Sequence, residues 1–172
     1  MPRRFFRRFA FKRDELANRW FLSPFRGLLL DDRLWGIRRK TVVPAFSLGL
    51  FVACMPFPGH MLAAVLAALA LRVNIPVAVF ATFASNPLTM APIYYFEYRV
   101  GANLLSIPQR PIQFDMSIEW LTTTFLSIWQ PMLLGSVLVG AITALIGHAL
   151  LAGLWHLSLV RYVSARRSKR RH

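Results

Sequence analysis

The sequence has one cysteine, few acidic residues and no cluster of metal-ligating side chains. Cys54 alone cannot form a disulfide within the chain, and no Cys, His, Asp or Glu spacing matches a metal site. There is also no Ser-His-Asp arrangement in a nucleophile elbow and no glycine-rich phosphate loop. These absences predict a protein that is not an enzyme and that needs no cofactor.

Charge is scarce in the middle of the chain and abundant at its ends. Residues 1–40 carry twelve Lys and Arg against four acids, and residues 161–172 carry six bases and no acid, whereas residues 41–160 hold three of each. Basic residues beside an apolar block are typical of cytoplasmic ends under the positive-inside rule. Nucleic-acid binding by basic tails is the alternative, but no folded basic domain or aromatic platform accompanies them. We therefore expect no nucleic-acid partner.

Long apolar runs dominate the centre. An uncharged run of 31 residues (41–71) is followed after Arg72 by one of 24 (73–96), and residues 131–160 form a third. A spanning helix needs roughly 20 apolar residues. We predict an all-α integral membrane protein whose last run is one long C-terminal transmembrane helix. Its parts are a basic cytoplasmic or interfacial segment (1–40), a membrane domain (41–160) and a basic cytoplasmic tail (161–172).

The N-terminal segment has two chemically different faces. In residues 3–12, at about 100° per residue, the arginines fall on one side of a helix, opposite Phe5, Phe6 and Phe9. This pattern predicts an amphipathic helix lying on an anionic leaflet, with membrane lipids and their anionic headgroups as partners. A disordered basic arm is the alternative, because ten residues form a marginal helix.

Both central runs are interrupted in the middle. Residues 55–59 contain two prolines and a glycine, and residues 85–87 read Ser-Asn-Pro. Proline removes a backbone donor and ends or kinks a helix. Asn86 is a natural N-cap, with Pro87 at the first helical position and Thr89 in the first turn. The pattern predicts half-helices over 41–55, 59–71, 76–85 and 87–98. Paired breaks of this kind point to a binding site.

Charge also suggests a topology. If residues 41–71 cross the membrane and residues 131–160 return, both basic ends lie in the cytoplasm. Residues 73–98 then form a re-entrant hairpin that turns at 85–87. The alternative of three full crossings places one basic end outside.

The breaks define a candidate binding site. Half-helices that begin at Gly59 and Pro87 would point partly positive N-termini into the membrane interior, which suits an anion such as a lipid phosphate. Arg72 and Arg99 would add full charges if they reach the same cavity, and His60 can titrate near neutral pH. The candidate substrate-binding residues are Pro56, Pro58, Gly59, His60, Arg72, Asn86, Pro87, Thr89 and Arg99.

A structural interpretation of the same residues stays open. The prolines can simply bend helices, while Asn86 and Thr89 bond neighbouring backbone, and His60 can be a packing residue. Glu97 is the one acid close to an apolar run. Proton transport is one role for such an acid, but because charges inside membranes usually pair, we expect it to form an ion pair with Arg72 or Arg99 instead.

Six short motifs follow one another between residues 49 and 101. They are Gly49-Leu-Phe51, Pro56-Phe-Pro58-Gly59, Arg72-Val-Asn74-Ile-Pro76, Asn86-Pro87-Leu-Thr89, Pro92-Ile-Tyr94 and Tyr98-Arg-Val-Gly101. Together they resemble the bacterial membrane family called domain of unknown function 2062, over about residues 40–160. The resemblance implies an inner-membrane protein of Gram-negative bacteria, sometimes joined to glycosyltransferase modules, with no settled activity. A looser, fold-level likeness links the paired breaks to the DedA-type lipid-carrier transporters.

Two functions follow as hypotheses. The first is a small inner-membrane transporter or flippase-like protein for an anionic envelope lipid of the polyprenyl-phosphate type. The second is a non-transporting scaffold or partner subunit that holds an envelope-synthesis enzyme through the basic ends. A homo-oligomer is a further option, since Ser136, Gly140 and Ala144 keep the four-residue spacing of small residues found in helix contacts.

Overall fold

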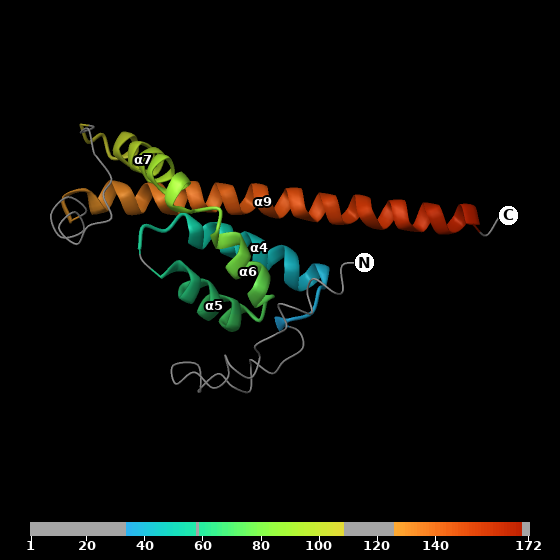
Figure 1. Cartoon of the computed structure of the whole chain (residues 1–172). Coiled ribbons are helices and arrows are strands. Elements are labelled where there is room, and N and C mark those ends of the chain that lie inside the picture. Colours follow the sequence, from blue (N-terminus) through green and yellow to red (C-terminus); the bar gives the residue numbers. More distant parts are fainter. Residues whose placement is uncertain (1–33, 58, 109–125, 170–172) are drawn as a thin grey trace, which may run out of the picture.

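The computed structural model describes residues 34–57, 59–108 and 126–169, and the elements in these ranges are all helices. They are α4 (Arg39–Ala53), α5 (His60–Leu71), α6 (Ile75–Thr82), α7 (Pro87–Leu104) and α9 (Leu126–Lys169) (Figure 1). The all-α fold class is thus confirmed for the described part of the chain. The amphipathic helix expected over residues 3–12 lies outside it.

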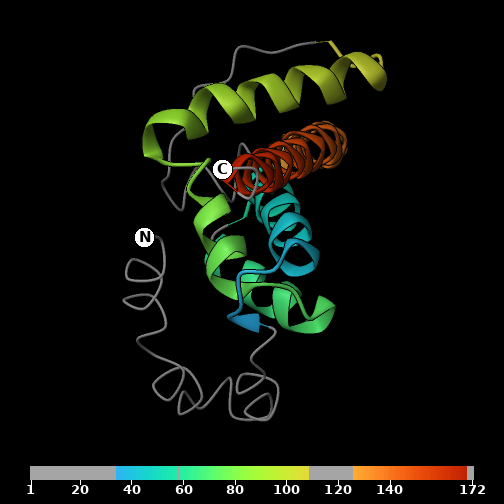
Figure 2. The ribbon, with the colours of Figure 1, turned by 90° about the vertical axis from the view of Figure 1, so that its right-hand side faces the viewer.

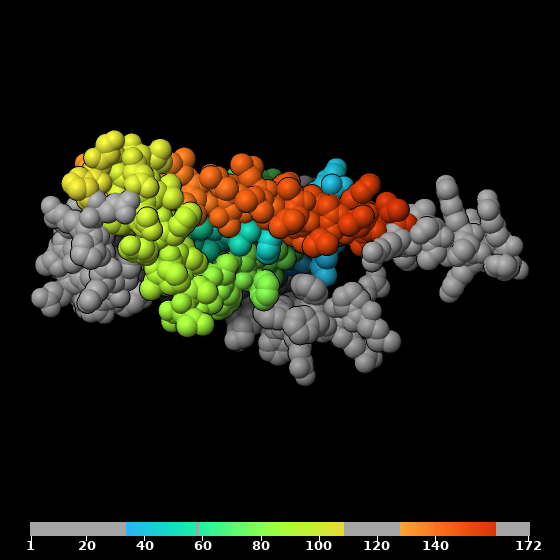
Figure 3. Space-filling view, turned by 90° about the horizontal axis from the view of Figure 1, so that it is seen from above, coloured from blue at the N-terminus to red at the C-terminus, as the bar shows by residue number. Residues whose placement is uncertain are grey.

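Helix α9 contains the segment Ile128–Val160, which is long and apolar enough to cross a membrane. Only 11% of its most apolar window is buried, so it does not resemble the core helix of a soluble protein. Figure 3 shows α9 uncovered on one face beyond its contact with α7. Exposed aliphatic side chains of α9 include Leu133, Leu134, Val137, Leu138, Ile142, Leu145 and Ile146. Such a continuous apolar surface supports association with a membrane.

The limits of α9 differ from the prediction at both ends. The helix begins at Leu126, so Pro131 lies inside it rather than at its start. At the other end it continues to Lys169, through the boundary predicted at residue 160. Charge changes sharply at that boundary, but charge alone does not end a helix, because Lys and Arg are good helix formers.

The first apolar run folds back on itself as a helical hairpin. The backbone N–H of Asn74 donates to the Thr41 carbonyl at 3.2 Å, and its side-chain amide donates to the Gly36 carbonyl at 3.0 Å. The two ends of the 41–71 run therefore meet, and Ala45 packs with Ala68 in one buried cluster. This hairpin does not support the prediction that residues 41–71 cross the membrane once. Charge could not detect the hairpin, because either arrangement keeps both basic ends on one side.

The second apolar run, residues 73–96, does not fold back on itself. Ala78 and Ala81 of α6 lie against Gly49 in the middle of α4, whereas Tyr94 of α7 bonds to Met55 beyond its end. Figure 2 shows α7 continuing from α6 and crossing α9 obliquely. These contacts therefore do not support the re-entrant hairpin predicted for residues 73–98, and the fold-back lies in α4 and α5.

Glycines allow α9 to approach its neighbours closely. Gly135 packs against the Glu97 carbonyl of α7, and Gly101 packs against the Pro131 carbonyl. Gly140 and Gly147 lie beside Phe51 and Leu50 of α4, so α4 and α9 run antiparallel. Small residues commonly serve this purpose between membrane helices. Gly101 lies inside α7, which continues to Leu104.

Candidate functional site

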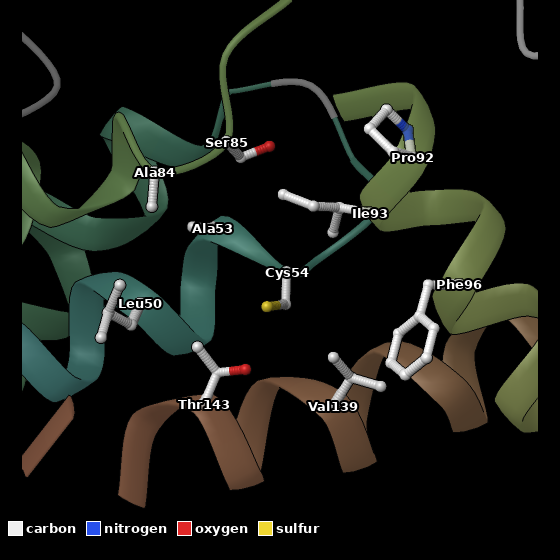
Figure 4. Close-up of a pocket in the computed structure, with 10 residues that line it drawn as sticks. All are labelled: Leu50, Ala53, Cys54, Ala84, Ser85, Pro92, Ile93, Phe96, Val139 and Thr143. Carbon is white, nitrogen blue, oxygen red and sulfur yellow. The ribbon is translucent and has the colours of Figure 1, made fainter. Parts of the chain in front are cut away.

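The end of α4, just before the first break, and Ser85 of the second break line one cavity of about 340 Å³. The Tyr94 hydroxyl of α7 donates to the Met55 carbonyl in the first break at 3.3 Å, which joins the two regions. Figure 4 shows the cavity between the end of α4, the second break, α7 and α9. Its lining residues are Leu50, Ala53, Cys54, Ala84, Ser85, Pro92, Ile93, Phe96, Val139 and Thr143.

The cavity is apolar apart from three small polar groups. These are the Cys54 thiol and the Ser85 and Thr143 hydroxyls, which come from three different parts of the chain (Figure 4). Val139 and Thr143 lie in the middle of the apolar segment of α9. The cavity can therefore accept a hydrocarbon chain, but none of these lining residues carries a full charge that could hold an anion.

The second break is closed by a complete capping box. The Asn86 side-chain oxygen accepts hydrogen bonds from the N–H groups of Leu88 and Thr89, at 2.9 and 3.1 Å. In return the Thr89 hydroxyl accepts from the Asn86 N–H at 3.0 Å and donates to the Ala84 carbonyl at 2.9 Å. The predicted N-cap at Asn86 and the start at Pro87 are confirmed. Because these N–H donors are already hydrogen-bonded, they are not available to bind an anion at the start of α7. This favours the structural interpretation of the second break.

The first break is more open. Pro56 is buried, Pro58 lies outside the described residues, and Gly59 adopts a left-handed conformation (φ 91°) immediately before α5. No side chain caps the start of α5. His60 makes an edge contact with the Phe57 ring, and its buried Nδ1 has no hydrogen-bond partner in the described part of the chain. Of the two predicted anion-binding helix ends, only that of α5 keeps its donors free of a side-chain cap.

The two arginines do not reach the cavity. Arg72 ends α5 in a left-handed conformation (φ 53°), and α5 has 12 residues, so Arg72 lies about 18 Å along the helix from His60. Arg99 is exposed, with its guanidinium 5.8 Å from the centre of the Tyr95 ring. The expectation that both converge on the breaks is not met. The hairpin carries Arg72 away from the first break, and the helical turn points Arg99 outward.

Glu97 lies in surroundings that differ from those expected from the sequence. Its side chain is 0% exposed, and neither carboxylate oxygen has a hydrogen-bond partner among the described residues. The expected ion pair with Arg72 or Arg99 is therefore not formed. The helical spacing could have indicated this, since Glu97 is four residues from both Ile93 and Gly101 and shares their inward face.

The capping box yields a stability prediction. Replacing Asn86 with leucine removes two hydrogen bonds to backbone donors, and we expect a loss of about 1–2 kcal/mol, the upper range for a lost cap, if water does not replace them. Pro87→Ala is the matched control and should cost less, because alanine is compatible with a helix start. Thermal unfolding of both purified variants in detergent measures the difference. An Asn86→Leu protein as stable as the Pro87→Ala protein would contradict the cap.

Comparison with known proteins adds one finding. The family model described as "Uncharacterized protein conserved in bacteria (DUF2062)" matches residues 22–164, which include both breaks and every residue that lines the cavity. No curated protein and no solved structure shows significant similarity to the chain. The match confirms the resemblance drawn from the six motifs. The chain belongs to this bacterial family.

Proposed function

We propose that the protein is a small inner-membrane transporter or flippase-like protein that handles an anionic envelope lipid of the polyprenyl-phosphate type. The observation that carries the proposal is one cavity lined by the end of α4, just before the first break, and by Ser85 of the second break, beside the middle of the apolar segment of α9. Broken helices at mid-depth are a common way to build a substrate site in membrane transporters. The apolar walls suit the hydrocarbon part of such a lipid.

In this proposal α9 crosses the membrane, α4 and α5 form a re-entrant hairpin, and α6 and α7 form a broken crossing. Arg72 then lies on the same membrane face as residues 38–40, since Asn74 is bonded to both Gly36 and Thr41. Together with the basic segments 1–40 and 161–172, these residues would form a positive cytoplasmic face. Such a face attracts anionic lipid headgroups.

The phosphate of the lipid would be bound at the start of α5. The uncapped N–H groups there carry the positive end of the helix dipole, and the free Nδ1 of His60 adds a hydrogen-bonding group. This assignment keeps Gly59 and His60 as candidate ligands. It gives Asn86, Pro87 and Thr89 a structural part, because their polar groups are already used within the capping box.

Lipid movement in reconstituted liposomes tests the proposal. We expect the wild-type protein to move a labelled polyprenyl phosphate between leaflets faster than empty liposomes do. Thr143→Phe places a large ring in the cavity and should reduce this movement at least tenfold, about 1.4 kcal/mol in the barrier. Ile142→Phe is the matched control, because Ile142 is the next residue in the chain but its side chain is exposed. Equal rates for the two variants would contradict a transport route through the cavity.

The scaffold remains the second candidate, and one observation favours it. Helix α9 continues nine residues past its apolar segment, from Val160 to Lys169, over a sequence rich in arginine. A basic helix that projects from the membrane domain could hold an envelope-synthesis enzyme or help to bind a second copy of the chain. Wild-type lipid movement no faster than in empty liposomes would favour this candidate.

A further inference from the structure

Glu97 is an ionisable side chain buried inside the molecule without a cation to pair with it among the described residues. It is 0% exposed, and both of its carboxylate oxygens lack hydrogen bonds within the described residues. The backbone around it is tightly packed, because its carbonyl touches Gly135 of α9. Neither the capping box nor the apolar cavity accounts for an acid at this position.

The groups around Glu97 leave its charge uncompensated. From α4 the nearest group is the Cys54 thiol, and α9 contributes Gly135 and its apolar neighbours. On α7 itself, Tyr94 and Tyr98 are buried on the same side, whereas Arg99 is exposed and lies against Tyr95. Along α9, the first titratable residue after Gly135 is His148, and its ring is hydrogen-bonded to the Ser47 hydroxyl instead. No cation from any of these elements pairs with the carboxylate.

An isolated carboxylate in such surroundings would cost several kcal/mol, so the neutral acid is the form that fits this packing. The Glu97 carboxyl group also lies close to a path by which its proton could leave. Cys54 adjoins Glu97 and at the same time lines the cavity, so one side chain separates the carboxyl group from that space.

We propose that Glu97 is a proton-binding site. In the conformation of this structure the carboxyl group holds one proton. When α7 separates from α9 and water enters the cavity, the O–H bond breaks, the proton passes to water and the carboxylate stays behind in a hydrated site. If the proposed lipid transport is correct, on which this last step rests, the proton is the coupling ion.

Infrared spectroscopy of the purified full-length protein tests the site directly. At neutral pH exposed carboxyl groups are ionised, so a buried neutral acid gives a separate carbonyl band. We expect this band in the wild-type protein and its complete loss in Glu97→Gln. The matched acid-to-amide change Glu15→Gln, in the basic N-terminal segment, should leave the band intact. A wild-type protein without the band, or a band that survives in Glu97→Gln, would overturn the proposal.

A second measurement keeps the test valid even if Glu97→Gln folds poorly. A native protein that holds a proton which its unfolded chain releases must lose stability as pH rises. Thermal unfolding of the wild-type protein should therefore shift to lower temperature with rising pH. A rise in the unfolding temperature with rising pH, over the same pH range in which the infrared band is followed, would argue against the bound proton.

Liposomes separate this inference from the transport proposal. If both are right, a pH gradient should change the rate of lipid movement in the wild-type protein at least severalfold and have no effect on Glu97→Gln. A band at Glu97 without any wild-type lipid movement would keep the proton site and remove transport. Lipid movement with no band at Glu97 would keep transport and remove the proton site.

Discussion

A cysteine at position 72 should react with a membrane-impermeant maleimide only after the inner membrane is permeabilised. The side chain is exposed at the end of α5, next to the turn where Asn74 bonds to Gly36 and Thr41. An Arg38→Cys protein should behave in the same way, as should cysteines at positions 2 and 170. Ser106→Cys, beyond the end of α7, should instead react from the periplasmic side, together with a cysteine at position 109.

This experiment distinguishes the hairpin from the arrangement that charge first suggested. A straight crossing by residues 41–71 would place positions 38 and 72 on opposite faces, so Arg72→Cys would be labelled in intact cells. The difference is all-or-none, which makes it insensitive to modest changes in expression. The native Cys54 is buried, and a cysteine-free Cys54→Ser protein provides the background control. Labelling of Arg72→Cys alongside Ser106→Cys would contradict the hairpin.

The positions of the helix breaks could be predicted because local chemistry determines them. At the first break two prolines and a left-handed glycine fall together and end the helix, whereas the single prolines Pro44, Pro92 and Pro131 lie inside helices. At the second break Asn-Pro before a threonine supplies a cap, a first residue and a reciprocal hydrogen bond. The predicted halves therefore agree with α4, α5 and the start of α7 to within a few residues. Asn74, which caps α6 by accepting from the Val77 N–H, carried the same information but was not identified.

The direction of each segment after a break could not be predicted from the same residues. It depends on which helices bury their small residues against one another, such as Gly49 on Ala78 and Ala45 on Ala68. These contacts join positions far apart in the sequence. The positions of the charged side chains depend on the directions of these segments. Because the directions could not be predicted, we expected Arg72 at the breaks and Glu97 in an ion pair, and the structure shows neither.

The contact between α7 and α9 gives the prediction with the largest effect on stability. In Gly135→Ala the new methyl group would overlap the Glu97 carbonyl and lie 3.1 Å from the Gly101 nitrogen, so two helix backbones would have to separate. Overpacking a core usually costs about 1–3 kcal/mol, and we expect a cost at or above the top of that range, because backbone cannot rotate aside as a side chain can. Thermal unfolding in detergent should show the lowest midpoint for this variant.

Two other glycines of α9 supply graded controls for that prediction. At Gly147 the obstacle is the end of the flexible Leu50 side chain, so Gly147→Ala should cost less than Gly135→Ala. At Gly153 nothing lies within 4 Å, and alanine should stabilise the helix by up to about 1 kcal/mol through its better helix propensity. The order expected for unfolding temperature is Gly153→Ala, then Gly147→Ala, then Gly135→Ala. If Gly135→Ala were as stable as Gly153→Ala, α7 could not rest on α9 at this point, and the close packing that isolates Glu97 from partners and water would be absent.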